Sequence, residues 1–404
     1  MTVIARARAW RRALQAVGAV GVSVGLIAAG PAAGAHPATQ AASPASAASS
    51  IDATRAARTY QAMQKYLYIP KYHLYQSSDN ANLFSYLWDF DNAYSATDYL
   101  AGMPNGGSKY RTDLAARDAG LAAYYDADET DPSGAAQPPA YASGVEPPLG
   151  NGGTTFYDDN AWVGLDAMYQ YRLTGQKTEL AVGEDIFKYA VSGWDNSTTD
   201  ACPGGVYWED SGGSPRNTVS NGPNAEVGLM VYQATGDSYY LQWAEKMYDW
   251  VRTCLLAPNG MYYDHLNSDS TGAVNTAEWT YNQGVMIGAG VLLYQATGDQ
   301  TYLQQAEQTA TSSMSADGTV SALDTQPDVF DVIFFRNLFY LAQFDHNPAY
   351  RQLAASYANA AWTGDRQVTG LFDDPDPNGG ESLVNQTAPM AELYALLAGS
   401  PPLG

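Results

Sequence analysis

Residues 228–241 read GLMVYQATGDSYYL, and residues 290–303 repeat this stretch as GVLLYQATGDQTYL. A weaker copy, MYQYRLTG, occupies residues 168–175. The Thr-Gly dipeptides of the three copies begin at positions 174, 235 and 297, so they are 61 and 62 residues apart. Similarity at a fixed period indicates a structural unit that is repeated along the chain.

Each copy has the pattern of a helical hairpin. Its glycine stands where an apolar helical periodicity stops, a position that favours a left-handed cap, and a second helical pattern follows at once. The same periodicity predicts twelve helices, with no sustained alternation of apolar and polar residues. These are residues 52–68, 84–102, 109–126, 158–174, 177–193, 220–235, 238–256, 281–297, 300–314, 328–345, 348–362 and 384–398. Six hairpins in a chain too short for a long open array predict an all-α (α/α)6 barrel, a closed toroid.

The connections between the predicted helices are of two kinds. Turns at the Thr-Gly dipeptides are short, whereas the returning connections are long and rich in Gly, Pro, Asp, Asn and Trp. The long ones are residues 127–157, 194–219, 257–280, 315–327 and 363–383. Long loops on one face of a repeat array usually build its binding surface. Counting sixteen residues back from each capping glycine gives Asp159, Ser220 and Asn282, which should therefore stand at one depth in this face.

The first 50 residues have the composition of export and linker segments. Residues 1–35 combine a basic start, an apolar core over 17–29 and an Ala-Gly-Ala cleavage site, as in a secretion signal peptide. The apolar core is shorter than the roughly 20 residues that a membrane span needs. Residues 36–50 are rich in Ala, Ser and Pro, and we expect a disordered linker there. Residues 51–404 are then one large domain.

The charge balance excludes several classes of partner. Without the four signal-peptide arginines the chain has 16 basic and 42 acidic residues, a net charge of −26. So acidic a surface repels nucleic acid and anionic membranes. It suits a secreted, extracellular protein, expected as a monomer, that acts on a neutral or cationic partner. Cys202 and Cys254 are the two cysteines, and in an oxidising compartment one disulfide is their simplest use.

An acidic pair opens one of the predicted helices. Asp158 and Asp159 follow a Gly/Pro-rich loop and precede the apolar periodicity that starts at Trp162. Free N–H groups at a helix start favour negative charge, so the pair can serve as an ordinary acidic first turn. It can also serve in retaining glycoside hydrolysis, which needs two carboxyl groups about 5–5.5 Å apart, a spacing within reach of neighbouring residues. Close like charges push the two pKa values apart, as an acid and a nucleophile require.

The motif YDDNAW at 157–162, the motif WTYNQG at 279–284 and the Ala-Thr-Gly-Asp turns resemble the α-1,6-mannanases of glycoside hydrolase family 76. The resemblance covers most of residues 55–400. It implies an (α/α)6 barrel, retaining endo-cleavage of α-1,6-linked mannan, and no cofactor. It also implies that Asp158 is the nucleophile and Asp159 the general acid/base. Two alternatives share the fold: a mannan transglycosylase with the same residues, and a mannan-binding protein without catalysis.

Other residues are candidates for contact with the polysaccharide. They are Trp88, Asp89, Asp91, Tyr157, Asn160, Trp208, Asp264, Trp279, Tyr281, Asn282 and Arg336. Trp88 fits the core equally well, and its neighbouring aspartates fit helix caps. Arg336 lies in an apolar helix, where a buried ion pair is the more ordinary use.

Metal and histidine chemistry are not indicated. Residues 374–379 begin like a calcium loop, but Asn385 stands where such a loop has glutamate, so no metal site is expected. His73, His265 and His346 have no triad or ligand spacing and are interpreted as surface or loop residues.

Overall fold

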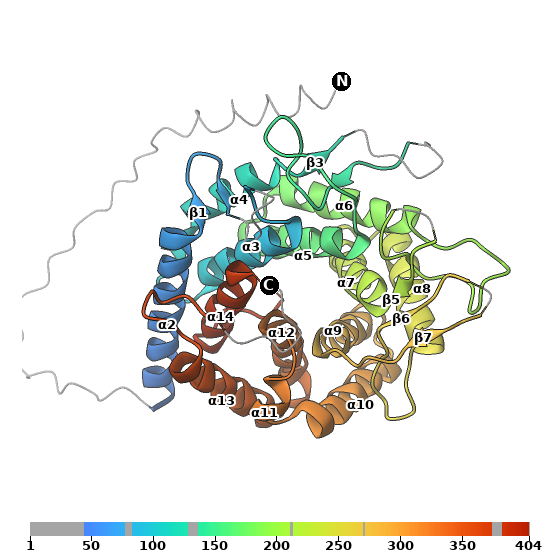
Figure 1. Ribbon diagram of the computed structural model, residues 1–404. Helices are drawn as coiled ribbons and strands as arrows, with labels where there is room; N and C mark the ends of the chain where they lie inside the picture. Colours follow the sequence, from blue (N-terminus) through green and yellow to red (C-terminus); the bar gives the residue numbers. More distant parts are fainter. Residues whose placement is uncertain are drawn as a thin grey trace, which may run out of the picture. The chain divides into compact units, whose positions relative to one another are not determined.

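A closed inner ring of helices is the central feature of the computed structural model, which describes residues 44–76, 83–127, 136–210, 213–269, 271–373 and 382–403. In this part of the chain the ring consists of α3 (Leu87–Gly102), α5 (Tyr157–Thr174), α7 (Thr218–Thr235), α9 (Thr280–Thr297), α12 (Asp328–Asp345) and α14 (Leu383–Leu397). Each helix packs against the next, and α14 packs against α3 (Figure 1). The ring therefore closes on itself.

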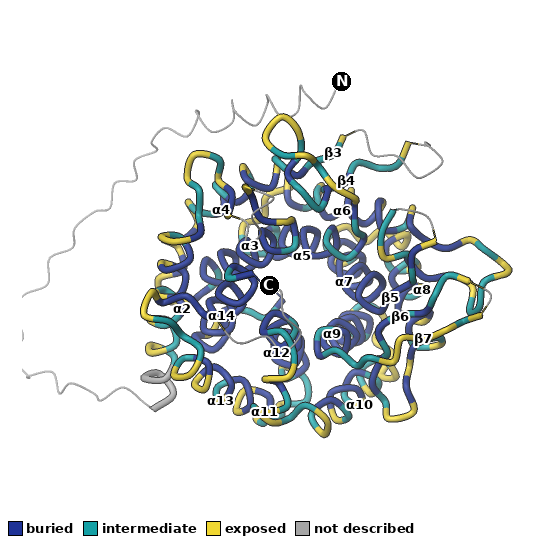
Figure 2. The backbone as a smooth tube through the Cα atoms, in the orientation of Figure 1, coloured by how far each residue is buried: buried dark blue, intermediate teal, exposed yellow. Residues whose placement is uncertain are grey.

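A second layer of helices surrounds this ring. It consists of α2 (Pro44–Tyr66), α4 (Arg111–Leu121), α6 (Lys177–Ser192), α8 (Ser238–Cys254), α10 (Gln300–Asp317) and α13 (Pro348–Gly364). The short helices η1 (Gly107–Tyr110) and α11 (Val320–Leu323) lie in connections. Figure 2 shows the inner helices buried nearly throughout, whereas the outer helices expose one side. The predicted (α/α)6 barrel is confirmed, and all twelve predicted helices are present.

The capping glycines set the register of the ring. Helices α5, α7 and α9 each have 18 residues and end before Gly175, Gly236 and Gly298. These glycines have φ of 72°, 73° and 76°, a left-handed conformation that a residue without Cβ adopts easily. Because the three helices are equally long, their first turns lie at one level, as the sequence predicts.

The structure differs most from the prediction at two helix ends. Helix α2 begins at Pro44, so residues 44–50, assigned to the linker from their composition, are helical. Helix α4 ends at Leu121 because the chain soon turns into strand β3. Residues 1–43, with the predicted signal peptide and most of the linker, lie outside the described residues. Residues 47–404 form one compact unit. In the described part of the chain we find no helix long and apolar enough to cross a membrane.

Short antiparallel sheets stiffen the long connections. They are formed by β1 (Tyr68–Ile69) with β2 (Leu74–Tyr75), β3 (Tyr125–Asp126) with β4 (Ala140–Tyr141), and β5 (Arg216–Asn217) with β6 (His265–Leu266) and β7 (Val274–Asn275). Strands of two residues carry no detectable alternation, so the sequence does not reveal them. Cys202 and Cys254 are joined by a disulfide, with Cα atoms 6.1 Å apart, which ties the α6–α7 connection to the end of α8.

Candidate active site

The acidic pair lies in the first turn of α5, at the face where the long connections meet. Phe156 is the N-cap of this helix, so Asp158 and Asp159 are its second and third residues. Both side chains are half-buried. The indole Nε1 of Trp208 donates a hydrogen bond to Asp158 Oδ2 at 3.2 Å, and the same indole packs against Phe156 with 4.9 Å between ring centroids. We call Asp158 and Asp159 the mouth pair.

The two acids of the mouth pair have different surroundings. Burial raises the pKa of Asp158 from 3.8 to about 7, although backbone N–H groups of the first turn and Trp208 lower it in part, and the charge of Asp264 raises it. Burial, with the charges of Asp158 and Asp89, raises the pKa of Asp159 well above its ordinary value. Within the described residues no ion pair involves either acid. Hydrogen-bond donors thus favour the carboxylate of Asp158, whereas burial and like charges act against the carboxylate of Asp159.

The start of α3 brings another acid close to the pair. Asp89 is buried and accepts a hydrogen bond from Ser382 Oγ at 2.8 Å. Burial raises the pKa of Asp89 to about 6. Trp88 is half-buried and packs against Trp162, with ring centroids 5.8 Å apart. The charge of Asp89 acts on Asp159, so Asp89 lies close to the mouth pair, whereas the observed contact of Trp88 is with Trp162.

Asp264 is the centre of another polar group, and its charge acts on Asp158. Its Oδ2 lies 2.9 Å from His265 Nδ1 and accepts a longer hydrogen bond from Asn275, while its Oδ1 accepts one from Asn282 Nδ2 at 3.4 Å. Burial and the charges of Asp264 and Asp158 raise the pKa of Tyr281 well above its ordinary value. His265, interpreted from the sequence as a surface or loop residue, belongs to this polar group.

An aromatic wall adjoins this polar group. Tyr281 stacks on Phe330 with ring centroids 3.8 Å apart and planes 2° from parallel. Trp279 meets the same Phe330 edge-on at 5.8 Å. Both Tyr281 and Trp279 remain half-buried. The structure thus brings the WTYNQG segment close to the acidic pair, since the charge of Asp158 raises the pKa of Tyr281.

Two sequence-predicted contact residues have other uses. Tyr157 is buried and stacks on Tyr189 of α6 at 4.6 Å, behind the mouth. Asn160 is fully buried, and its amide bonds Tyr141 and the carbonyl of Phe156. Both side chains are packed into the wall, so in this structure their partners are protein groups, and their contact with substrate stays a prediction. Their neighbours in sequence reach the site because successive helical residues point about 100° apart.

Asn160 belongs to a repeated device that the sequence analysis missed. Asn160, Asn221 and Gln283 each stand four residues after the N-cap of an inner helix. Each amide bonds both the N–H and the C=O of one residue in the preceding connection, namely Tyr141, Val206 and Tyr262. Each also donates to the carbonyl of its N-cap residue. The three amides are spaced by 61 and 62 residues, as are the Thr-Gly dipeptides, so the signal was present.

A second group of acids lies deeper in the ring. We call Asp91, Asp98, Asp166, Glu226 and Glu392, together with Arg336, the inner-ring acidic cluster; all are buried. Arg336 Nη1 lies 3.7 Å from Glu392 Oε1, and its guanidinium lies within 6 Å of the Tyr99 and Trp162 rings. Burial raises the pKa of all five acids, that of Glu226 to about 8.

Two of the predicted contact residues belong to this cluster. Asp91 and Arg336 line a cavity together with Asp166 and Glu392. Arg336 is 4% exposed and paired with a buried acid, which agrees with the structural use that its apolar helix suggested. We therefore assign Asp91 and Arg336 to the interior of the ring.

Metal binding has no support in the described part of the chain. There, no group of three His, Cys, Asp or Glu side chains has the arrangement of a metal site. The calcium-like segment at 374–379 lies outside the described residues. What the mouth pair does supply is two neighbouring, half-buried carboxyl groups that belong to no ion pair of the described residues.

Comparison with known proteins agrees with the family resemblance. A family model, glycosyl hydrolase family 76, matches residues 141–392, more than half of the chain. The chain is 31% identical over 169 residues to a mannan endo-1,6-α-mannosidase of Saccharomyces cerevisiae, an alignment that covers 38% of this chain and 37% of the yeast protein. The chain thus spans little more than a third of the length of the curated relatives it matches.

Solved structures share the fold. A glycoside hydrolase family 76 mannosidase from Bacteroides thetaiotaomicron superposes with a TM-score of 0.74 at 24% identity, covering 86% of this chain and 98% of that one. An inactive variant of an α-1,6-mannanase from Salegentibacter, with two consecutive aspartates replaced by asparagine, was solved with α-1,6-mannotriose. It superposes with a TM-score of 0.68 at 22% identity, covering 86% and 99% of the two chains.

Proposed function

This chain belongs to glycosyl hydrolase family 76, and we propose that it is a secreted, retaining endo-α-1,6-mannanase that uses the mouth pair. In this proposal Asp158 is the nucleophile and Asp159 the general acid/base. The observation that carries it is an acidic pair at the mouth of the barrel, in which Trp208 Nε1 donates a hydrogen bond to Asp158 at 3.2 Å and neither acid belongs to an ion pair of the described residues.

The proposed reaction has two steps. The Asp158 carboxylate attacks C1 of the mannosyl unit while Asp159 donates its proton to the departing glycosidic oxygen, so a covalent glycosyl-enzyme forms. Asp159, now ionised, takes a proton from a water molecule as the water oxygen attacks C1 and releases Asp158. Two inversions at C1 give net retention of configuration.

The surroundings of the two carboxyl groups support these roles. The nucleophile must be ionised and the acid protonated in the same enzyme molecule. Trp208 and the first-turn N–H groups stabilise the charge of Asp158, whereas Asp159 faces the charges of Asp158 and Asp89. The inactive relative, in which two consecutive aspartates are replaced, supports the assignment to the pair.

The surroundings suit a neutral polysaccharide. Trp208 is 39% exposed at the mouth, and Trp279 and Tyr281 offer aromatic surface beside it. Aromatic faces with polar neighbours are a suitable surface for sugar rings. We propose that the partner is α-mannan, bound without cofactor by a monomer outside the cell. The acidic balance of the chain disfavours nucleic acid and anionic membranes.

The test is hydrolysis of linear α-1,6-mannan, with α-1,2- and β-1,4-linked mannans as controls. We expect reducing ends and short oligosaccharides from the α-1,6 polymer alone. Asp158→Asn should lower the rate by about 10³-fold or more, because the glycosyl-enzyme can no longer form.

Asp299→Asn is the matched control. Asp299 is an exposed N-cap on α10, at the opposite end of the hairpins, and its loss should leave the rate unchanged. An active Asp158→Asn protein would remove Asp158 from the nucleophile role. Products that consist solely of transfer to added acceptor sugars would replace hydrolysis by transglycosylation.

A further inference from the structure

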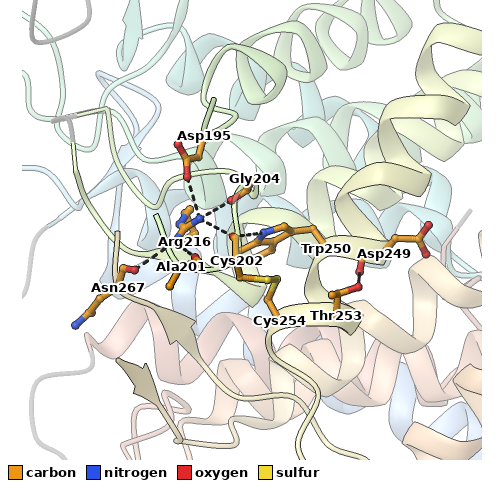
Figure 3. Close-up of a disulfide and its surroundings, with 10 residues drawn as sticks. All are labelled: Asp195, Ala201, Cys202, Gly204, Arg216, Asp249, Trp250, Thr253, Cys254 and Asn267. Atoms are coloured by element: carbon orange, nitrogen blue, oxygen red, sulfur yellow. Dashed lines mark hydrogen bonds and ion pairs between the residues drawn. A yellow bond between two sulfur atoms is a disulfide. The ribbon is translucent and has the colours of Figure 1, made fainter. Parts of the chain in front are cut away.

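Arg216 is buried behind the mouth and makes an unusual number of contacts. Its Nη1 donates to Asp195 Oδ2 at 2.9 Å and to the carbonyls of Cys202 and Gly204 at 2.9 and 2.8 Å. Its Nη2 donates to the carbonyls of Ala201 and Asn267 at 2.9 and 3.3 Å. Figure 3 shows these partners converging on one guanidinium. A planar fork of donors suits such an arrangement, whereas an ammonium group does not.

The carbonyls around Arg216 are held in place independently. Cys202 is bonded to Cys254 at the end of α8, and its carbonyl also accepts a hydrogen bond from Trp250 Nε1 at 3.1 Å (Figure 3). Gly204 has φ of 102°, which favours glycine, and a Cβ there would come within 2.6 Å of the Trp194 ring. The disulfide and this turn therefore preset the carbonyl oxygens that the guanidinium binds.

The backbone of Arg216 lies between the two segments that reach Asp158. On one side Arg216 bridges Tyr207, and Trp208 N–H donates to the Pro215 carbonyl at 2.8 Å. On the other side β5 pairs with β6, and Thr218 N–H donates to the Asp264 carbonyl at 2.9 Å. Trp208 and Asp264 are thus neighbours of β5, one on each side.

We propose that Arg216 is a positioning residue for the proposed nucleophile, and that it places Trp208 and Asp264 against Asp158 from a cage fixed by the Cys202–Cys254 disulfide. It does not touch the substrate. Nothing in the family assignment or in the sequence motifs pointed to this arginine. The inference rests on the proposed function for its kinetic readout, but its geometric part stands without it.

The direction of the effect follows from the groups that face Asp158. These are Asp159 on its own helix, Trp208 and Asp264 on the two connections, and Tyr281 on α9. The Trp208 hydrogen bond lowers the pKa of Asp158, and it outweighs the opposite effect of the Asp264 charge. Displacement of both should therefore raise the pKa of Asp158.

Arg216→Lys tests the proposal because it keeps the charge and loses the fork. We expect kcat/KM at pH 6 to fall by about tenfold or more, with the acid limb of its pH profile moved up by about one pH unit. Trp208→Phe should move the limb in the same direction. In the double variant the Trp208 hydrogen bond is already lost, so Arg216→Lys should add no upward shift to that of Trp208→Phe, and displacement of Asp264 should slightly reduce it. Arg252→Lys, which affects an arginine of α8 bonded to the Tyr262 hydroxyl, should leave the limb in place.

Two results would overturn the proposal: an unchanged acid limb in folded Arg216→Lys, or additive shifts in the double variant. If Arg216→Lys does not fold, Asp195→Asn decides instead, because it removes one partner of the guanidinium and should give a smaller shift of the same sign. The carboxyl carbon-13 resonance of Asp158, identified by its loss in Asp158→Asn, reports the same ionisation without substrate. A shifted resonance in a protein inactive on mannan would sustain the positioning role and refute the proposed function.

Discussion

The mouth pair and the inner-ring acidic cluster share helix α5, where Asp159 and Asp166 are seven residues apart. Both groups are acidic, and burial raises the pKa values of both. They differ in their counter-charge. The cluster surrounds Arg336, which is paired with Glu392, whereas no ion pair in the described chain involves either acid of the mouth pair. They differ also in access, since Asp159 is half-buried and Asp166 is 3% exposed.

This difference separates a structural use of buried charge from a chemical one. In the inner-ring acidic cluster Arg336 supplies a counter-charge to buried acids, several of whose oxygens have no hydrogen-bond partner among the described residues. Removing one partner of such a buried pair is strongly destabilising. Two acids without a cation must instead share a proton, and at an open mouth that proton can reach a substrate. Helix α5 thus carries an acid of each group, about two helical turns apart.

The largest expected effect comes from Asp159→Asn. The leaving group then receives no proton, and the rate on α-1,6-mannan should fall by about 10²–10⁴-fold. With a substrate whose leaving group needs no proton, azide should restore turnover, because it replaces the water that Asp159 would activate. The measurement is the rate on both substrates with and without azide.

Asp166→Asn is the control from the other group on the same helix. Its rate per folded molecule should stay within about threefold of wild type, since Asp166 is 3% exposed and lines the interior cavity with Arg336. Equal losses in Asp159→Asn and Asp166→Asn would end the distinction between the two groups. So would azide rescue that does not depend on the leaving group.

Arg336→Met should give the next largest effect, on stability. Removing the arginine leaves Glu392 and its neighbours buried without a cation, which typically costs about 3–5 kcal/mol. Denaturant titration with Asp185→Asn, an exposed acid of α6, as the control measures this loss. A variant with unchanged stability and a raised KM would instead return Arg336 to the substrate-contact role that the sequence also allowed.

Much of the fold could be predicted from the sequence because its signals are local. A Thr-Gly cap and an apolar periodicity need no distant partner, so α5, α7 and α9 were placed with their register. The two-residue strands could not be predicted, since their pairing joins residues such as Arg216 and Leu266 that are far apart in the chain. The early start of α2 at Pro44 was missed because its composition favours disorder as readily as helix.

Part of the site could be predicted from the sequence because the start of a helix determines where the side chains of its first turn lie. The sequence placed Asp158 and Asp159 at the mouth, but it also assigned Tyr157 and Asn160 to substrate, although successive residues point to different sides. It could not find the inner-ring acidic cluster, because Asp98, Glu226 and Glu392 come from three different helices and no local pattern joins them. Arg336 was noticed because one charge in an apolar helix is itself a signal.

The smallest expected effect is on the pH dependence of stability, in Glu226→Gln. The folded protein keeps the Glu226 proton to about pH 8, because burial raises this pKa from 4.5, whereas the unfolded chain releases it near pH 4.5. Between these values the folded state binds more protons, so this group lowers the free energy of unfolding as the pH rises. Glutamine does not titrate and is free of this loss.

The variant should therefore gain stability relative to wild type between pH 5 and pH 8. One proton gives a slope of about 1.4 kcal/mol per pH unit at most, and since neighbouring acids share the charge we expect a total gain on the order of 1–2 kcal/mol. Urea titrations at four pH values measure it. A loss of stability in the variant would mean that Glu226 is ionised and paired with Arg336 in the folded protein. The cluster would then be an ion-pair network, and its contrast with the mouth pair would rest on Arg336 even more firmly.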